Sequence, residues 1–177
     1  MSETGHRSGP DFLAERPEQL FYLVYQVHRR RDMAIEQMLK DVGMGMVAWR
    51  VLLAVNRMEP CTMNELARYT TIERTTLTRS LDQMVAQGLV ERETPAADRR
   101  QVLVTLSEKG REEYRRGYDL ISGWNRKAIA GMAAAKQQQL LDLLKELLVS
   151  SLPDAELAED IIGFEYTGQL GATRDKA

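Results

Sequence analysis

The chain has 177 residues, 44% of them hydrophobic, which suits one folded domain with or without a dimerising extension. Its formal net charge of −2 argues at first sight against nucleic-acid binding. However, residues 151–177 carry six acidic and two basic side chains, which leaves residues 1–150 with 22 basic and 20 acidic ones. Any binding to DNA is therefore expected to depend on a few well-placed arginines.

Several other functions lack the residues they need. The single cysteine cannot form an intrachain disulfide, and the two histidines, His6 and His28, do not cluster with other metal ligands. The sequence has no glycine-rich phosphate loop and no nucleophile motif, so we expect no catalytic residue, no metal and no cofactor. Without a run of about 18 apolar residues or an N-terminal secretory signal, we expect a cytoplasmic protein with no membrane contact.

Residues 1–15 are expected to form a disordered or loosely docked arm, and residues 16–41 a first long helix. The helix is apolar on two sides, because Phe21, Tyr22 and Tyr25 lie outside the stripe that begins at Leu20 and Leu23. Such a helix predicts a dimer contact or a ligand pocket. The run from His28 to Arg31 in its middle fits either a solvated surface or an anion-binding corner.

A second helix is expected from Met46 to Arg57, with Trp49 in the core. Glu59-Pro60 should end this helix, and Cys61 should lie in the following loop. Thr62 and Glu65 have the spacing of a capping box, which predicts the start of a third, short helix. We expect a turn at Tyr69–Thr71 after it.

A fourth helix is expected to begin at Arg74 and to stop at Gly88, a residue suited to a left-handed helix end. Its predicted buried stripe consists of Leu77, Leu81, Met84 and Val85. The rest of its surface is rich in threonine and arginine, which can hydrogen-bond base edges in the DNA major groove. The candidate DNA-binding residues on it are Arg74, Thr75, Thr76, Thr78 and Arg79. Taken alone, this helix would fit an ordinary solvated surface equally well.

The next segment, residues 89–106, reads as a β-hairpin whose second strand points Val102, Val104 and Leu106 to one face. The connection, residues 95–100, is too long for a tight turn and carries a charged tip: Asp98, Arg99 and Arg100. A helix-turn-helix followed at once by a hairpin is a winged helix. Arginines at the tip of such a wing suit the narrow, strongly negative minor groove.

Four short segments together resemble the MarR-type winged-helix transcriptional regulators. They are Thr76-Leu77-Thr78-Arg79, Gly88-Leu89-Val90-Glu91-Arg92, Asp98-Arg99-Arg100 and Leu106-Ser107-Glu108-Lys109-Gly110. The resemblance implies a mainly α-helical (α+β) fold: a winged helix-turn-helix region over residues 46–106, with its wing at 89–106, between N- and C-terminal dimerisation helices at 16–41 and 107–150. It implies a homodimeric repressor that binds double-stranded DNA at a palindromic operator.

The resemblance also implies a small-molecule cleft between the first, second and fifth helices. A small anionic aromatic effector would there meet Tyr25, His28, Arg29 and Trp49. In the wing, it implies that Asp98 orients Arg100, leaving Arg99 for a phosphate. An alternative interpretation is a winged helix that serves as a protein-interaction or scaffolding module, which the near-neutral charge favours.

The rest of the chain predicts further helices. One should run from Ser107, a candidate cap, to about Met132, and another should carry a broad leucine band that includes Leu140, Leu144 and Leu148. We interpret that band as a dimer contact. Pro153 should end this helix, and the acidic extension, residues 151–177, should contain a short helix that Gly163 stops.

Overall fold

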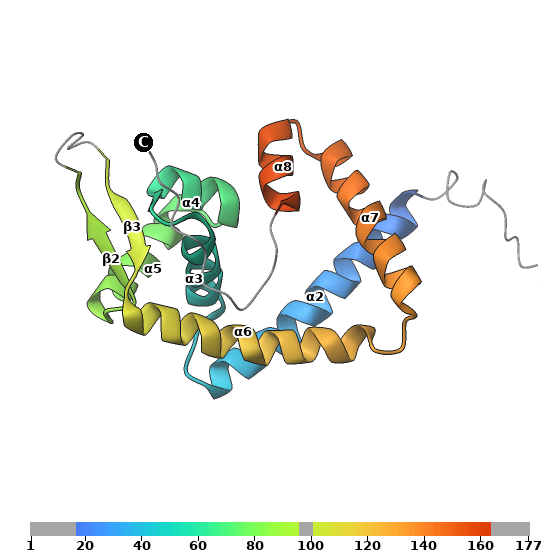
Figure 1. Cartoon of the computed structure of the whole chain (residues 1–177), viewed down its shortest axis with the longest axis horizontal. Coiled ribbons are helices and arrows are strands. Elements are labelled where there is room, and N and C mark those ends of the chain that lie inside the picture. Colours follow the sequence, from blue (N-terminus) through green and yellow to red (C-terminus); the bar gives the residue numbers. More distant parts are fainter. Residues whose placement is uncertain (1–16, 96–100, 164–177) are drawn as a thin grey trace, which may run out of the picture.

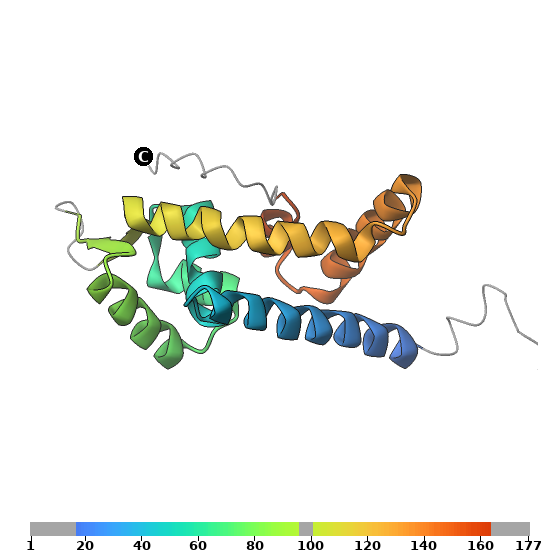
Figure 2. The ribbon, with the colours of Figure 1, turned by 90° about the horizontal axis from the view of Figure 1, so that it is seen from below.

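The computed structural model describes residues 17–95 and 101–163. Helices dominate, and one small sheet lies at one end of the molecule, so the predicted fold class is confirmed (Figure 1). The helix α6 runs beneath the molecule from this end to the other, where α2 and α7 lie (Figures 1 and 2). The elements are α2 (Pro17–Asp41), α3 (Met46–Met58), β1 (Cys61–Thr62), α4 (Met63–Thr70), α5 (Arg74–Ala86), β2 (Val90–Glu93), β3 (Leu103–Leu106), α6 (Glu108–Ile129), α7 (Ala134–Ser151) and α8 (Ala155–Ile162).

The sheet is antiparallel and has the strand order β1-β3-β2. β2 and β3 pair from Val90 opposite Leu106 to Glu93 opposite Leu103, so the hairpin strands are shorter than predicted. The prediction that Val102 shares the buried face of Val104 and Leu106 was wrong, because it lies beyond the last of these pairs and is 43% exposed. Cys61, predicted in a loop, begins β1 and pairs with Val104.

The helix-turn-helix begins and ends through local hydrogen bonds. The predicted capping box is confirmed: the Glu65 N–H donates to the Thr62 hydroxyl at 3.3 Å, and the Thr62 N–H donates to the Glu65 carboxylate at 2.7 Å. The predicted turn begins too early, since α4 continues through Thr70. The left-handed residue is Thr71, whose φ is 53°.

The predicted left-handed stop of α5 at Gly88 is confirmed by its φ of 69°. The Gly88 N–H donates to the Val85 carbonyl, and the Leu89 N–H donates to the Met84 carbonyl, both at 2.9 Å. These two bonds form a Schellman motif, which satisfies carbonyls that a helix end otherwise leaves unpaired. It turns the chain directly from α5 into the wing.

The core lies where α3 contacts α4, α5, α6 and β3. Leu77, Leu81 and Met84 of α5 are buried as predicted, but Val85 is 39% exposed because it lies at the edge of the stripe that packs on α3 and β2. Trp49 stacks on Tyr114 of α6 with ring centroids 5.6 Å apart. The indole lies so close to α6 that a Cβ added at Gly117 would be 2.7 Å from it.

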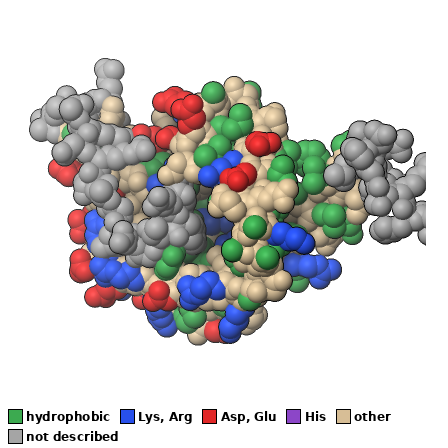
Figure 3. Space-filling model, turned by 45° about the vertical axis from the view of Figure 1, so that its right-hand side comes forward, with side chains coloured by type: hydrophobic (Ala, Val, Ile, Leu, Met, Phe, Trp, Pro, Cys, Tyr) green, Lys and Arg blue, Asp and Glu red, His purple; other side chains and the backbone are tan. Residues whose placement is uncertain are grey.

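The terminal helices expose large apolar side chains. In α2, seven such side chains between Leu20 and Val27 are 37% to 70% exposed. Five more on α7, between Leu140 and Val149, are 43% to 54% exposed, and none of the 18 residues of α7 is buried in the described part of the chain. Figure 3 shows hydrophobic side chains at the surface on this side of the molecule.

The predicted short helix of the acidic extension is α8, which ends at Gly163 as expected. Asp154 begins it by accepting a hydrogen bond from the Leu157 N–H at 3.1 Å, and its carboxylate also pairs with Arg68 of α4. The Leu157 N–H, aided by Arg68, holds the pKa of the Asp154 carboxyl below its ordinary value against the opposing effect of burial. The extension therefore contacts the helix-turn-helix.

None of the described helices is long and apolar enough to span a membrane.

Gly110 provides a test of how closely α6 packs on the winged helix. A Cβ at Gly110 would lie 1.9 Å from the Leu89 carbonyl oxygen, so Gly110→Ala should force the backbones apart and lower the free energy of unfolding by about 1–3 kcal/mol. Gly123→Ala is the matched control on the same helix, because nothing lies within 4 Å of its added Cβ. This control should be neutral or stabilising by up to about 1 kcal/mol. Denaturant unfolding of both variants checks the difference, and equal effects would contradict it.

Candidate nucleic-acid interface

The recognition helix α5 presents all five predicted DNA-binding side chains at the surface. Leu77, Leu81 and Met84 are buried, which fixes the rotation of the helix about its axis. The five exposed residues are Arg74, Thr75, Thr76, Thr78 and Arg79. The helix thus offers hydroxyl groups and guanidinium groups together, which is the chemistry that base edges and phosphates require.

An acidic residue that the sequence analysis missed caps this helix. Glu73 is the N-cap of α5, and its carboxylate accepts a hydrogen bond from the Thr76 N–H at 3.0 Å. Backbone N–H donation from Thr75 first, and then from Thr76, holds the pKa of Glu73 below its ordinary value. This carboxylate satisfies N–H groups at the start of α5 that would otherwise be available to an anion. Glu73 was missed because glutamate is not among the preferred N-cap residues.

Three further contacts involve residues of α5. The Arg74 guanidinium donates to the Asn64 side chain of α4 at 2.8 Å, and the Thr78 hydroxyl donates to the Arg74 carbonyl at 2.8 Å. On β2, Arg92 forms an ion pair with Asp82 of α5 at 2.6 Å. The recognition helix is therefore tied to the helix before it and to the wing strand after it.

The predicted wing residues Asp98, Arg99 and Arg100 lie outside the described residues. The chain is described up to Pro95, two residues beyond the end of β2, and again from Gln101, two residues before β3. The orientation of Arg100 by Asp98 stays a prediction.

None of the four predicted effector-binding residues lines the cavity found between α5 and the start of α6. Trp49 is 3% exposed and stacks on Tyr114 in the core, where the sequence placed it, and its contact with an effector stays a prediction. Tyr25 and Arg29 are exposed on α2. His28 lies 3.4 Å from Asp32, a carboxylate that also pairs with Arg50 of α3 at 2.7 Å.

That cavity has a volume of about 620 Å³ and lies between α5, the start of α6 and the turn from α2 to α3. Its apolar lining includes Met44, Leu52 and Met84. Its polar lining includes Arg79 of the recognition helix together with Lys109 and Arg116 of α6, and also Glu113, which pairs with Arg116 at 3.7 Å. A cavity of this size with an apolar floor and cationic rim suits a small anion that has an apolar body. No sequence motif marked it, because its residues come from separate segments of the chain.

The described residues contain no group of three or more histidine, cysteine, aspartate or glutamate side chains that could hold a metal ion. Cys61 is fully buried in β1, and its thiol lies 3.7 Å from the Val104 carbonyl.

Comparison with known proteins gives consistent matches. The family model described as the MarR family matches residues 42–101. Among characterised relatives, the chain is 25% identical over 125 residues to the HTH-type transcriptional repressor IacR from Pseudomonas putida, a match that covers 71% of this chain and 75% of IacR.

Solved structures are similar over most of the chain. Wild-type MarR in its apo form from E. coli is 26% identical with a TM-score of 0.64, covering 73% of this chain and 96% of that protein. BpsR from Bordetella bronchiseptica, whose DNA binding is regulated by 6-hydroxynicotinic acid, is 22% identical with a TM-score of 0.64. The match covers 73% of this chain and 98% of BpsR.

Proposed function

The chain belongs to the MarR family of winged helix-turn-helix transcriptional regulators, and from this premise we propose that it is a ligand-responsive repressor that binds a palindromic operator as a homodimer. The observation that carries the proposal is the surface of α5, where five exposed threonine and arginine side chains lie opposite a buried stripe. In this role α5 enters the major groove, and the wing arginines Arg99 and Arg100 reach a phosphate and the minor groove. Such a repressor acts on the chromosome, so we expect the protein in the cytoplasm.

Dimerisation follows from the apolar surfaces of α2 and α7. Contiguous apolar patches of this kind are rare on monomeric proteins. A two-fold axis between two copies would cover both surfaces and direct the two α5 helices at half-sites about one helical turn apart, roughly 34 Å. In this proposal α2, α6 and α7 form the dimerisation region that the sequence predicts at 16–41 and 107–150.

The charge of the chain shapes the proposed binding mode. With a net charge of −2, the protein has little general attraction for DNA, so binding should depend on few phosphate contacts and decline only moderately with added salt. The rival interpretation, a protein-interaction module without specific DNA binding, predicts no retardation of the upstream DNA of its own gene in a gel-shift titration.

We propose the cavity between α5 and α6 as the effector site. A carboxylate near Arg116 or Lys109 would have an apolar floor beneath its ring, and Arg79 lines the same cavity. A ligand that pairs with Arg79 there would compete with a base for that guanidinium, so effector binding and DNA binding would oppose each other. The regulation of BpsR by an aromatic acid supports this type of control in a protein of the same fold.

Substitution of Arg79 tests base recognition. Arg79→Ala should weaken operator binding by about 1–3 kcal/mol and relax the preference at one position in each half-site. Arg79→Lys keeps the charge but loses the bidentate geometry, so it should bind random DNA like the parent and still discriminate poorly. Anisotropy titrations on the operator found by genome-wide footprinting, and on a scrambled duplex, measure both. Equal weakening on the two duplexes by Arg79→Ala would make Arg79 a phosphate contact.

Sedimentation tests the homodimer. The parent should sediment as a dimer at micromolar concentration. Leu144→Glu on α7 should produce a monomer, because burying an unpaired carboxylate in the dimer interface has a large unfavourable free energy. Lys145→Glu is the control on the same helix, since it changes a neighbouring side chain that is already charged. A parent that is monomeric at this concentration would contradict the proposal.

A thermal-shift titration with hydroxybenzoates tests the effector site. These phenolic carboxylates should raise the melting temperature of the parent and release it from operator DNA. Arg116→Gln should weaken both effects, while Arg115→Gln, which lies on the same helix outside the cavity, should not. If instead His28→Ala removes the response and Arg116→Gln does not, the site predicted from sequence on α2 is the correct one. No response from any hydroxybenzoate would count against the proposed effector class.

A further inference from the structure

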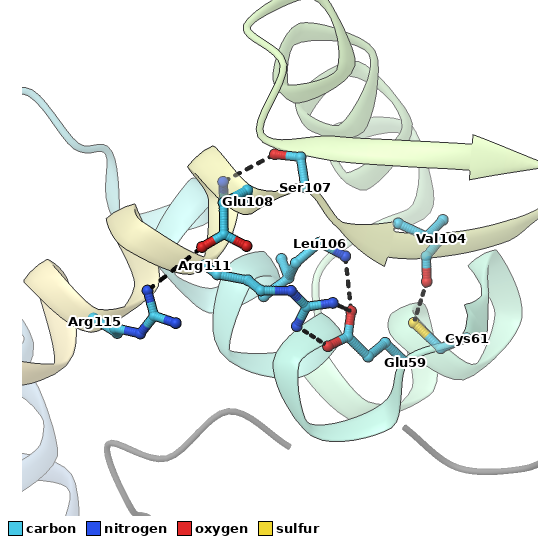
Figure 4. Close-up of polar contacts among 9 residues, drawn as sticks. Glu59, Cys61, Val104, Leu106, Ser107, Glu108, Arg111 and Arg115 are labelled. Carbon is cyan, nitrogen blue, oxygen red and sulfur yellow. Dashed lines mark hydrogen bonds and ion pairs between the residues drawn. The ribbon is translucent and has the colours of Figure 1, made fainter. Parts of the chain in front are cut away.

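A buried carboxylate joins three elements at the base of the wing. Glu59 follows the last residue of α3 and is only 1% exposed. It accepts a hydrogen bond from the Leu106 N–H of β3 at 2.8 Å and two from the guanidinium of Arg111 on α6, the Nη2 bond at 3.0 Å. Figure 4 shows the carboxylate between Leu106 and Arg111. The contact therefore connects the end of α3, the end of β3 and the first turns of α6.

The bond to Leu106 takes the place of a missing strand pair. β1 and β3 pair Cys61 with Val104 and Thr62 with Leu103. Continuing that register by two residues would bring Glu59 opposite Leu106. At that point the chain already belongs to the end of α3, and the Glu59 side chain accepts the Leu106 N–H. β3 is thus held on this edge by a side chain whose own position depends on Arg111.

The buried Glu59 carboxylate would destabilise the fold if any of its hydrogen-bond donors were absent. A carboxylate removed from water loses hydration that only a good set of donors replaces, and removal of one member leaves an uncompensated buried charge. Arg111 provides the charge and a two-pronged geometry that fits both carboxylate oxygens. Lysine could provide the charge alone.

The same turn of α6 is also tied to the recognition helix. The Ser107 hydroxyl donates to the Gly88 carbonyl at 2.6 Å, and the Lys109 ammonium donates to the Gln87 carbonyl at 2.9 Å. Through Ser107 and Lys109 the start of α6 contacts the end of α5, and through Arg111 and Glu59 it contacts the base of β3. This turn of α6 therefore contacts both the end of α5 and the base of β3, and it adds to the direct links between α5 and β2.

We propose that Glu59 and Arg111 are positioning residues for DNA binding, which hold the wing at the angle that lets it reach the minor groove while α5 lies in the major groove. The inference rests on the proposed function, since it requires that the wing contacts DNA. Neither side chain touches DNA in this mechanism. Both affect DNA binding by holding β3 in position.

Glu59→Gln is the main test, because it keeps the shape of the side chain and an acceptor for Leu106 but removes the charge that holds Arg111. We expect operator affinity to fall roughly tenfold, within the range of coupling that interacting residues show. Hydroxyl-radical footprinting should lose the minor-groove protection due to the wing, while guanine N7 protection in the major groove by α5 should remain. Arg111→Lys, a milder change, should show the same pattern with a smaller loss.

Ile35→Val, in the core on α2, is the control for general loss of stability. It should lower the melting temperature without a selective loss of wing protection, at a temperature where every variant is folded. If Glu59→Gln and Arg111→Lys leave minor-groove protection unchanged, or lose major-groove protection equally, the pair has no positioning role and the inference is overturned.

A double-mutant cycle separates this inference from the proposed function. In a background with Arg99→Ala and Arg100→Ala, Glu59→Gln should have almost no further effect on affinity, because the contact through which it acts is gone. A full tenfold effect in that background would overturn the positioning role while leaving the wing contact itself established. If the wing background binds the operator as tightly as the parent, the proposed wing contact fails and this inference fails with it.

Discussion

The structure depends on how closely α6 approaches the winged helix. Its buried stripe is Gly110, Tyr114, Gly117 and Ile121, spaced three and four residues apart on one face. The two glycines lie where the helix backbone meets the Leu89 carbonyl and the Trp49 ring, and the two large residues fill the space between and beyond them. Dispersion contacts fall off steeply with distance, so this near approach is what makes α6 and the winged helix one packed body.

A rigid attachment of α6 has a mechanical consequence. A helix of 22 residues is about 33 Å long, so a tilt of about 5° at one end moves the other end by about 3 Å. The first turns of α6 hold the recognition helix and the wing, and its last turns lie beside α2, where Arg31 donates to Asn125 at 3.1 Å. In a dimer, small changes in how the terminal helices pack would therefore change the separation of the two recognition helices. Such a change would move the two recognition helices away from the spacing of about 34 Å that separates successive major grooves on one face of DNA.

The features predicted correctly are those whose causes are local. The Thr62–Glu65 capping box, the Ser107 cap, the Gly88 stop and the stripe on α5 each depend on residues within a few positions of one another. Features that depend on distant partners were missed. The two-residue strand β1 shows no periodicity and forms only because Val104 pairs with Cys61. Likewise, nothing near Glu59 in the sequence reveals that its partner is Arg111, and Val85 is 39% exposed because it lies at the edge of the stripe that packs on α3 and β2.

The acidic groups near the interface bear on specificity. Glu73 caps the recognition helix with a carboxylate, Asp82 pairs with Arg92 beside it, and Asp154 neutralises Arg68 of α4. Each of these negative charges weakens the attraction to phosphates of any sequence, because that attraction depends on charge alone. In the proposed binding mode, hydrogen bonds from Arg79 or Thr75 to base edges depend on geometry, and Glu73 stabilises the helix that positions both side chains. A repressor must find its operator among a great excess of other sites, so lowering general affinity while preserving base contacts improves the ratio that matters for regulation.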